Sequence, residues 1–158
     1  MRWLYLEDYG ETHVASGYCS EEDKIATYRR PWTAVSTDSY IEDEPQGLHP
    51  RMYGTYPRFL ERYVRELKIM TLEEGIRRMT SLPAQFLGLR DRGLVKTGFR
   101  ADLVVFDPQS VKSRATFSSP QELPEGIAHV IVNGETVMHN GKSTGTLPGE
   151  VLRRERGE

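Results

Sequence analysis

The chain has 158 residues, 37% of them hydrophobic, and a formal net charge of -2 at pH 7. This length is enough for one ordinary domain. The near-neutral charge argues against a nucleic acid or an anionic membrane surface as a partner. No apolar run approaches the ~18 residues of a membrane span, and the single cysteine, Cys19, suits a reducing compartment. We therefore expect a soluble, cytoplasmic protein.

The N-terminal region predicts an α/β organisation. Residues 12–16 are short and β-prone. Ser20 precedes three acidic residues, which predicts a helix over about 20–30 that Pro31 ends. Residues 32–36 predict a buried strand. A strand, a helix and a strand within about 30 residues form one unit of an α/β protein.

A loop and further helices are predicted next. Residues 39–52 contain two prolines and a glycine, and this length is more typical of a functional loop than of a plain connector. Apolar residues on one face predict an amphipathic helix over 56–67. Thr71 begins a capping box that opens another helix, and Gly88 is placed to end the helix after it.

The chain changes to a β-rich pattern after residue 88. Residues 102–106 predict a strand, and 128–133 with 135–139 predict a hairpin on the Asn-Gly pair between them. The stretch 107–127 has little periodicity, and a loop of that length in a compact domain is expected to wrap over another element. So few strands need partner strands to make a stable sheet.

Two polar residues follow the predicted strand at 32–36. In a (β/α) barrel, polar residues at the C-terminal ends of strands line the active site. Asp38 could there act as general base and then as general acid; the alternative is an aspartate that bonds the loop backbone. Arg51, in the same loop, could grip a substrate carboxylate; the alternative is an exposed loop arginine.

Metal-ligand spacing is absent from the sequence. The four histidines, His13, His49, His129 and His139, form no His-x-His or His-Glu-x-x-His pair, and Cys19 has no partner spacing. We expect no metal site from this chain alone. There is likewise no Gly-x-Ser-x-Gly turn, phosphate-binding glycine loop or dinucleotide fingerprint.

Several blocks together resemble the N-acyl-D-amino-acid deacylases (D-aminoacylases) of the amidohydrolase superfamily. They lie at residues 35–39, 49–66, 79–108 and 144–153, so the resemblance covers essentially 11–154. The Ala-Asp-Leu-Val-Val-Phe sequence within the third block is shared by many amidohydrolases. The His-Pro-Arg-x-Tyr-Gly-Thr sequence that opens the second block is much more specific to the deacylases.

The resemblance implies a fold and a function. Family members are zinc-dependent hydrolases that cleave the acyl amide of N-acyl-D-amino acids, and they combine a (β/α)₈ barrel with a small β-sandwich. The implied fold class is α/β: the last strand and helix units of an incomplete barrel over 1–90, the C-terminal part of the sandwich over 91–154, and a frayed tail at 155–158. Asp38 would take a proton from the zinc-bound water and deliver it to the departing amine. Arg51 would grip the α-carboxylate of the substrate.

Two departures qualify the resemblance. Ser39 stands where the family often has glycine after the catalytic aspartate. The family's metal-binding His and Cys residues lie on earlier barrel strands that have no counterpart here. The expected partners are therefore the missing N-terminal part of the barrel and an N-acyl-D-amino acid, with zinc in the full-length family but none bound by this chain, which is expected to be inactive alone. Two alternatives stay open: a fragment of another amidohydrolase, such as a dihydroorotase- or hydantoinase-like enzyme, and a non-catalytic interaction or assembly module.

Overall fold

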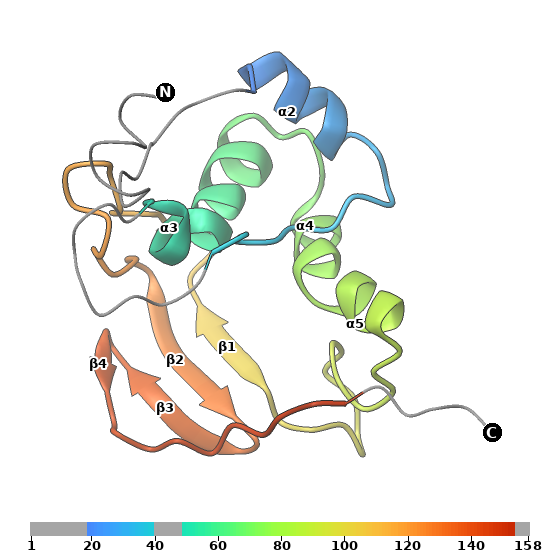
Figure 1. The fold of residues 1–158 in the computed structure, drawn as a ribbon, viewed down its shortest axis with the longest axis vertical. Helices are drawn as coiled ribbons and strands as arrows, with labels where there is room; N and C mark the ends of the chain where they lie inside the picture. Colours follow the sequence, from blue (N-terminus) through green and yellow to red (C-terminus); the bar gives the residue numbers. More distant parts are fainter. Residues whose placement is uncertain (1–18, 40–48, 154–158) are drawn as a thin grey trace, which may run out of the picture.

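The fold is a mixed α/β arrangement of helices and a four-stranded antiparallel sheet. The computed structural model describes residues 19–39 and 49–153. Figure 1 shows the sheet on one side of the molecule and the helices gathered beside it. The predicted α/β class is confirmed at this level.

The first described helix, α2, spans Glu21–Tyr28. The Ser20 side chain accepts a hydrogen bond from the Asp23 backbone N–H at 3.0 Å, which satisfies a donor that the first helical turn leaves unpaired. The helix ends before Pro31, as predicted.

The strand predicted over 32–36 is absent, and that prediction is wrong. These residues have no regular secondary structure, although Val35 is buried. The Val35 N–H donates to the carbonyl of Arg78, a helical residue, at 3.1 Å. A β-strand requires a neighbouring strand for its backbone groups, and within the described residues none lies beside this segment. The β-prone residues 12–16 lie outside the described residues.

One long helical segment forms the middle of the chain. It begins as α3, Arg51–Arg58, and continues as the π-helical η1, Phe59–Glu66. The helix therefore starts at Arg51 and not at about 56 as predicted; residues 40–48 of the predicted loop lie outside the described residues. Pro57 has no N–H to donate, and the winding widens directly after it.

Two short helices follow with the predicted caps. Helix α4 spans Leu72–Met79, and the Thr71 side chain accepts from the Glu74 N–H at 3.3 Å. Helix α5 spans Ser81–Leu87 and ends at Gly88, whose φ of 76° is left-handed. Both predicted signals are confirmed.

The sheet has the strand order β1-β2-β3-β4. Its strands are β1 (Leu103–Phe106), β2 (Ile127–Val132), β3 (Glu135–His139) and β4 (Lys142–Ser143). Asn133 and Gly134 have φ values of 48° and 85°, as a two-residue type I′ turn requires. The hairpin prediction is confirmed, while the very short β4 was not predicted.

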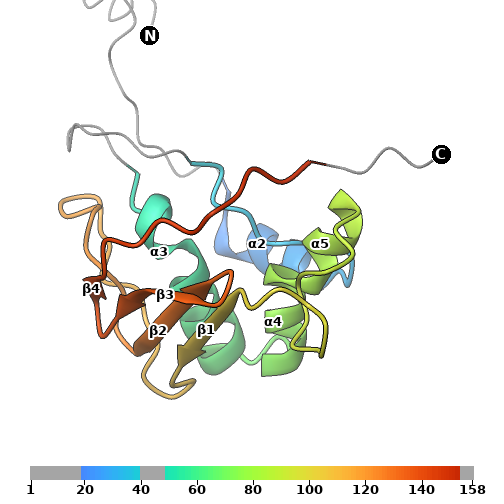
Figure 2. The same cartoon turned by 90° about the horizontal axis from the view of Figure 1, so that it is seen from below.

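The hydrophobic core is centred on η1. Its buried side chains are Phe59, Leu60, Tyr63 and Val64, which cluster with Val35 and Val111. Apolar residues of α2, α4, β1 and β2 pack against this cluster, so η1 joins the helices to the sheet. Figure 2 shows the same arrangement from a second direction, in which α3 stands above the sheet and the helix that continues from it passes behind the strands.

The stretch 107–127 wraps over η1, as predicted for a loop of its length. Val111 is only 2% exposed, and its carbonyl accepts a hydrogen bond from Arg65 at 2.6 Å. The Ser113 N–H donates to Glu61 at 3.2 Å. Gly54 of α3 lies so close that a Cβ there would come within 2.4 Å of the Ser113 hydroxyl. The loop is therefore part of the packed structure.

The described C-terminal segment returns from β4 past the hairpin toward α5 (Figures 1 and 2). The Asn133 side-chain amide donates to the Pro148 carbonyl at 2.7 Å, which ties this segment to the β2–β3 turn. No helix among residues 19–39 and 49–153 is long and apolar enough to cross a membrane.

Candidate active site

Asp38 lies at the end of the irregular segment that follows α2. Its φ of 46° is left-handed, a conformation that aspartate tolerates better than most residues. Its N–H donates to the Ser36 hydroxyl at 3.3 Å, and its side chain is 86% exposed. The local turn holds the backbone and leaves the carboxylate open to solvent.

Arg51 is the first residue of α3. Its backbone N–H donates to Nδ1 of His49 at 3.1 Å, and its side chain is 42% exposed. The guanidinium therefore extends from the start of a helix whose other end is buried in the core.

The structure brings these two predicted residues together. An amino group of the Arg51 guanidinium lies 3.1 Å from Oδ2 of Asp38. The two residues come from different segments, so the contact depends on how α3 packs beside residues 35–38. Exposed ion pairs contribute little to stability. Either residue of the Asp38–Arg51 pair can therefore give up the other for a different charged group at little cost in stability.

His49 is a neighbour of this pair, and no role was predicted for it from the sequence. Its ring meets Phe117 edge-on, with 5.0 Å between the ring centroids and 75° between the planes. Burial lowers the pKa of His49, and the nearby Arg51 cation lowers it further. In the sequence, the signal for this arrangement is Pro50: its side chain has no hydrogen-bond acceptor to cap α3, so a neighbouring residue must supply one.

Histidines do not form a metal centre within the described residues. His129 and His139 face one another across β2 and β3, with parallel rings 4.5 Å apart, while Cys19 is exposed. No group of three or more His, Cys, Asp or Glu side chains that could hold a metal ion occurs in 19–39 or 49–153. His13 lies outside these ranges. The described residues thus do not fit a zinc centre.

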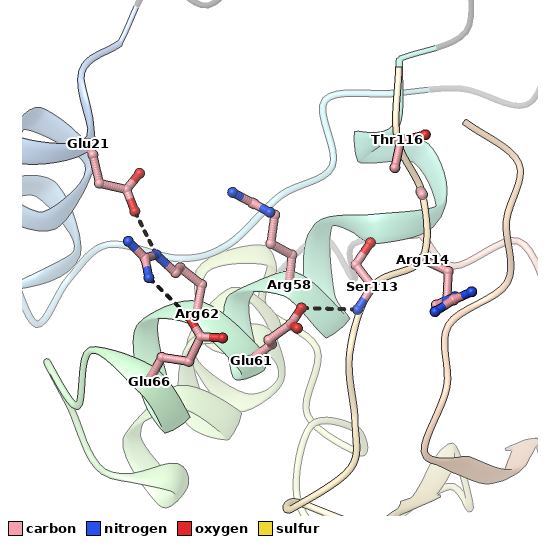
Figure 3. A pocket seen from close by; sticks show the side chains of 9 residues that line it. Glu21, Arg58, Glu61, Arg62, Glu66, Ser113, Arg114 and Thr116 are labelled. Atoms are coloured by element: carbon pink, nitrogen blue, oxygen red, sulfur yellow. Dashed lines mark hydrogen bonds and ion pairs between the residues drawn. The ribbon is translucent and has the colours of Figure 1, made fainter. Parts of the chain in front are cut away.

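A charged hollow of about 560 Å³ lies between α2, α3–η1 and the 107–127 stretch (Figure 3). Arg62 bridges two of its carboxylates, Glu21 at 3.1 Å and Glu66 at 2.9 Å. Burial alone would raise the pKa of Glu21, but hydrogen bonds from Arg62 and Tyr63 hold it below its usual value. Burial, followed by the Glu21 charge, raises the pKa of Tyr63 to about 12. These groups satisfy one another and connect α2 to η1.

A second hollow, of about 660 Å³, lies beside η1 and is lined in part by Leu60, Val64 and Pro108. Asp38 and Arg51 line neither hollow. The candidate pair is therefore an exposed arrangement on the surface of the described residues.

Residues 23–138 match the model of the amidohydrolase family. The chain belongs to this family. An N-acyl-D-glutamate deacylase of Alcaligenes xylosoxydans xylosoxydans is 46% identical over 107 residues, which are 68% of this chain and 22% of the relative. The chain thus spans about a quarter or less of the length of such a relative.

Solved structures show the same partial relationship. A D-aminoacylase crystal structure matches 80% of this amidohydrolase chain and 26% of its own, with 41% identity and a TM-score of 0.76. An N-acyl-D-glutamate deacylase from Bordetella bronchiseptica, complexed with zinc and a phosphonate mimic of the tetrahedral intermediate, matches 78% of this chain and 27% of its own, with 40% identity and a TM-score of 0.71. The predicted resemblance to the deacylases is confirmed.

The dihydroorotases, which are the alternative amidohydrolase relatives, match less of the chain. A dihydroorotase of Lactobacillus acidophilus is 32% identical over 87 residues, which are 51% of this chain. Both the identity and the coverage are lower than for the deacylases.

Proposed function

We propose that this chain is the C-terminal part of a zinc-dependent amidohydrolase that hydrolyses the acyl amide of N-acyl-D-amino acids. The observation that carries the proposal is the contact between Asp38 and Arg51. It occurs in a chain that is 41% identical to a D-aminoacylase structure covering 80% of its length.

The two side chains supply complementary chemistry. Amide hydrolysis needs a base for the attacking water and an acid for the departing amine, and one carboxylate can perform both steps in turn. We assign this role to Asp38. The Arg51 guanidinium can bind the α-carboxylate of the substrate through two parallel hydrogen bonds. Arg51 already holds a carboxylate, that of Asp38; the arriving substrate would replace it and release Asp38 toward the scissile amide.

The proposed chain organisation explains why this part would not act alone. We assign residues 1–90 to the end of the (β/α) barrel, 91–154 to the β-sandwich and 155–158 to a frayed tail. A barrel of ~250 residues does not close from its last units. The partner is then the N-terminal part of the barrel, which would supply the zinc ligands that the described residues lack.

Complementation tests the proposal. The chain is mixed, in buffer containing zinc, with the separately expressed N-terminal part of the Alcaligenes deacylase, and amine release is measured from N-acetyl-D-glutamate, N-acetyl-D-methionine and their L-enantiomers. We expect no turnover by either part alone and turnover of D-substrates by the mixture. Asp38→Asn should lower kcat by about 10²–10⁴-fold. Arg51→Lys should mainly raise KM, by about tenfold or more, because a bidentate charged contact is lost.

Matched substitutions away from the pair serve as controls. Glu150→Gln removes an exposed carboxylate in the C-terminal segment, and Arg114→Lys changes an arginine that pairs with Glu125 instead. Both should leave kcat and KM within about twofold of the unsubstituted chain. Clear turnover by the chain alone would contradict the expectation that it needs the N-terminal part of the barrel. Hydrolysis of dihydroorotate, with no hydrolysis of N-acyl-D-amino acids, would favour the dihydroorotase-like alternative.

A further inference from the structure

The start of α3 is capped in an unusual way. The N-cap residue is Pro50, which makes no side-chain hydrogen bond to the helix. The first N–H groups of a helix have no intrahelical acceptor and need a partner from elsewhere. Here Nδ1 of His49 accepts from the Arg51 N–H at 3.1 Å, and the His49 carbonyl accepts from the Met52 N–H at 3.1 Å. His49 therefore performs the capping that Pro50 cannot.

A distant segment holds the imidazole in this position. Phe117, from the stretch that wraps over η1, meets the His49 ring edge-on at 5.0 Å. Because Nδ1 accepts a hydrogen bond, it carries no proton, and the neutral ring must carry its proton on Nε2. The arrangement thus specifies one tautomer and one charge state.

We propose that His49 is the positioning residue for Arg51: its Nδ1 fixes the first turn of α3 and so directs the guanidinium toward Asp38. The inference rests on the proposed function, in which Arg51 binds the substrate carboxylate. His49 itself touches neither substrate nor the scissile amide in this proposal. A fixed helix start matters because Arg51 is the first residue of the helix, where fraying is greatest.

The surrounding charges favour the neutral ring. Among the residues that the structure describes, the groups that face His49 are the Arg51 cation from α3 and the uncharged Phe117 ring from the 107–127 stretch; Asp38 lies beyond Arg51. Burial and then the Arg51 charge lower the pKa of His49 from its ordinary 6.5. A lowered histidine pKa means that the capped state binds a proton less readily than the uncapped state. The cap should therefore persist above pH 6.5 and weaken as the pH falls below that value.

NMR on the chain itself tests the inference in three proteins. Long-range ¹H–¹⁵N correlation reads the tautomer of His49, and amide exchange reads the protection of the Arg51 N–H. In the unsubstituted chain we expect the Nε2–H tautomer. His49→Asn keeps an acceptor near the place of Nδ1 and should preserve the protection. His49→Leu keeps the bulk but removes the acceptor, and should speed Arg51 exchange by about five- to tenfold.

A control and a kinetic measurement complete the experiment. His139→Leu changes a histidine on β3 and should leave Arg51 exchange unaltered. An Nδ1–H tautomer in the unsubstituted chain would overturn the role of His49, and so would unchanged protection in the leucine variant. In the zinc-containing mixture with the N-terminal part of the Alcaligenes deacylase, His49→Leu should raise KM for N-acetyl-D-methionine and His49→Asn should not. An unaltered KM in Arg51→Lys, measured in the same mixture, would instead overturn the proposed function of Arg51.

Discussion

At the scale of single residues, Glu74 holds two arginines of α4. Its carboxylate accepts from Arg77 at 2.7 Å and from Arg78 at 2.8 Å. Arg78 is only 3% exposed and also donates to the carbonyl of Tyr28, so it joins α4 to the end of α2. A buried guanidinium needs such partners, because a charge without them is costly inside a protein.

Removing the Glu74 charge should destabilise the chain. Glu74→Gln leaves the buried Arg78 without its carboxylate, and we expect the free energy of unfolding to fall by about 2 kcal/mol. Urea denaturation followed by circular dichroism measures this. The neighbouring Glu73→Gln changes an exposed carboxylate of the same helix and should have a much smaller effect.

The effect of Glu74→Gln on the free energy of unfolding should depend on pH. The hydrogen bond from Arg77, with a further one from Arg78, lowers the pKa of Glu74 from 4.5 to about 2. A lowered carboxyl pKa stabilises the fold fully above the unfolded value and loses that contribution as the pH falls toward the folded value. The stability difference between the unsubstituted chain and Glu74→Gln should therefore shrink between about pH 4.5 and pH 2. A difference that stayed constant over this range would argue against the ion pairs as its cause.

At the scale of elements, the wrapping stretch is anchored where it enters β2. The Asp107 N–H donates to the Gly126 carbonyl at 2.9 Å, and Lys112 pairs with Glu125 in an isolated β-bridge. Gly126 has a φ of 80°, and a Cβ there would lie 2.5 Å from the backbone nitrogen of Val111. A side chain at this position would therefore push the buried Val111 backbone outward.

Two alanine substitutions separate strain from collision. Gly98 has a similar φ of 86°, but nothing lies within 4 Å of the Cβ it would carry. Gly98→Ala should cost about 1–2 kcal/mol, for the left-handed backbone alone. Gly126→Ala should cost that amount and a further 1–3 kcal/mol or so for the displaced backbone. Unfolding in urea compares them; equal losses would show that the close approach of Gly126 to Val111 does not matter.

At the scale of the whole molecule, the described residues expose much apolar surface. Trp32 is 72% exposed, Phe86 86% and Leu147 94%, and in β1 Val104 and Val105 are about half exposed. Strand β1 is also an end strand of the described sheet. Exposed apolar patches and open sheet edges favour association with another chain. This surface is consistent with the proposal that the chain packs against the rest of a longer amidohydrolase.

We expect the isolated chain to self-associate as its concentration rises. Light scattering coupled to size-exclusion chromatography measures the mass, and Val105→Lys should reduce association by placing a charge on the edge strand. Val95→Lys, at a residue that is 91% exposed but outside any strand, is the matched control and should reduce it less. A monomer with one cooperative melting transition at every concentration would instead favour an independent interaction module.

Local signals in the sequence were sufficient for several elements. The caps at Ser20, Thr71 and Gly88 and the Asn133–Gly134 turn formed as predicted. Each depends on hydrogen bonds or backbone preferences within a few residues, so the residues next to it in the sequence are enough to predict it. The family resemblance was readable for a related reason, because its motifs are short and contiguous.

Tertiary structure decided the remaining features, since each depends on a partner far away in the chain. Residues 32–36 had the composition of a strand, but no strand of the described part of the chain lies beside them, and Val35 bonds to a helix instead. The helix start at Arg51 depends on the ring of His49, which Phe117 holds from 68 positions further along. The contact between Asp38 and Arg51 likewise forms only when α3 packs beside the segment after α2. Residue types and spacing can propose such partners, but only the packed chain brings them within bonding distance.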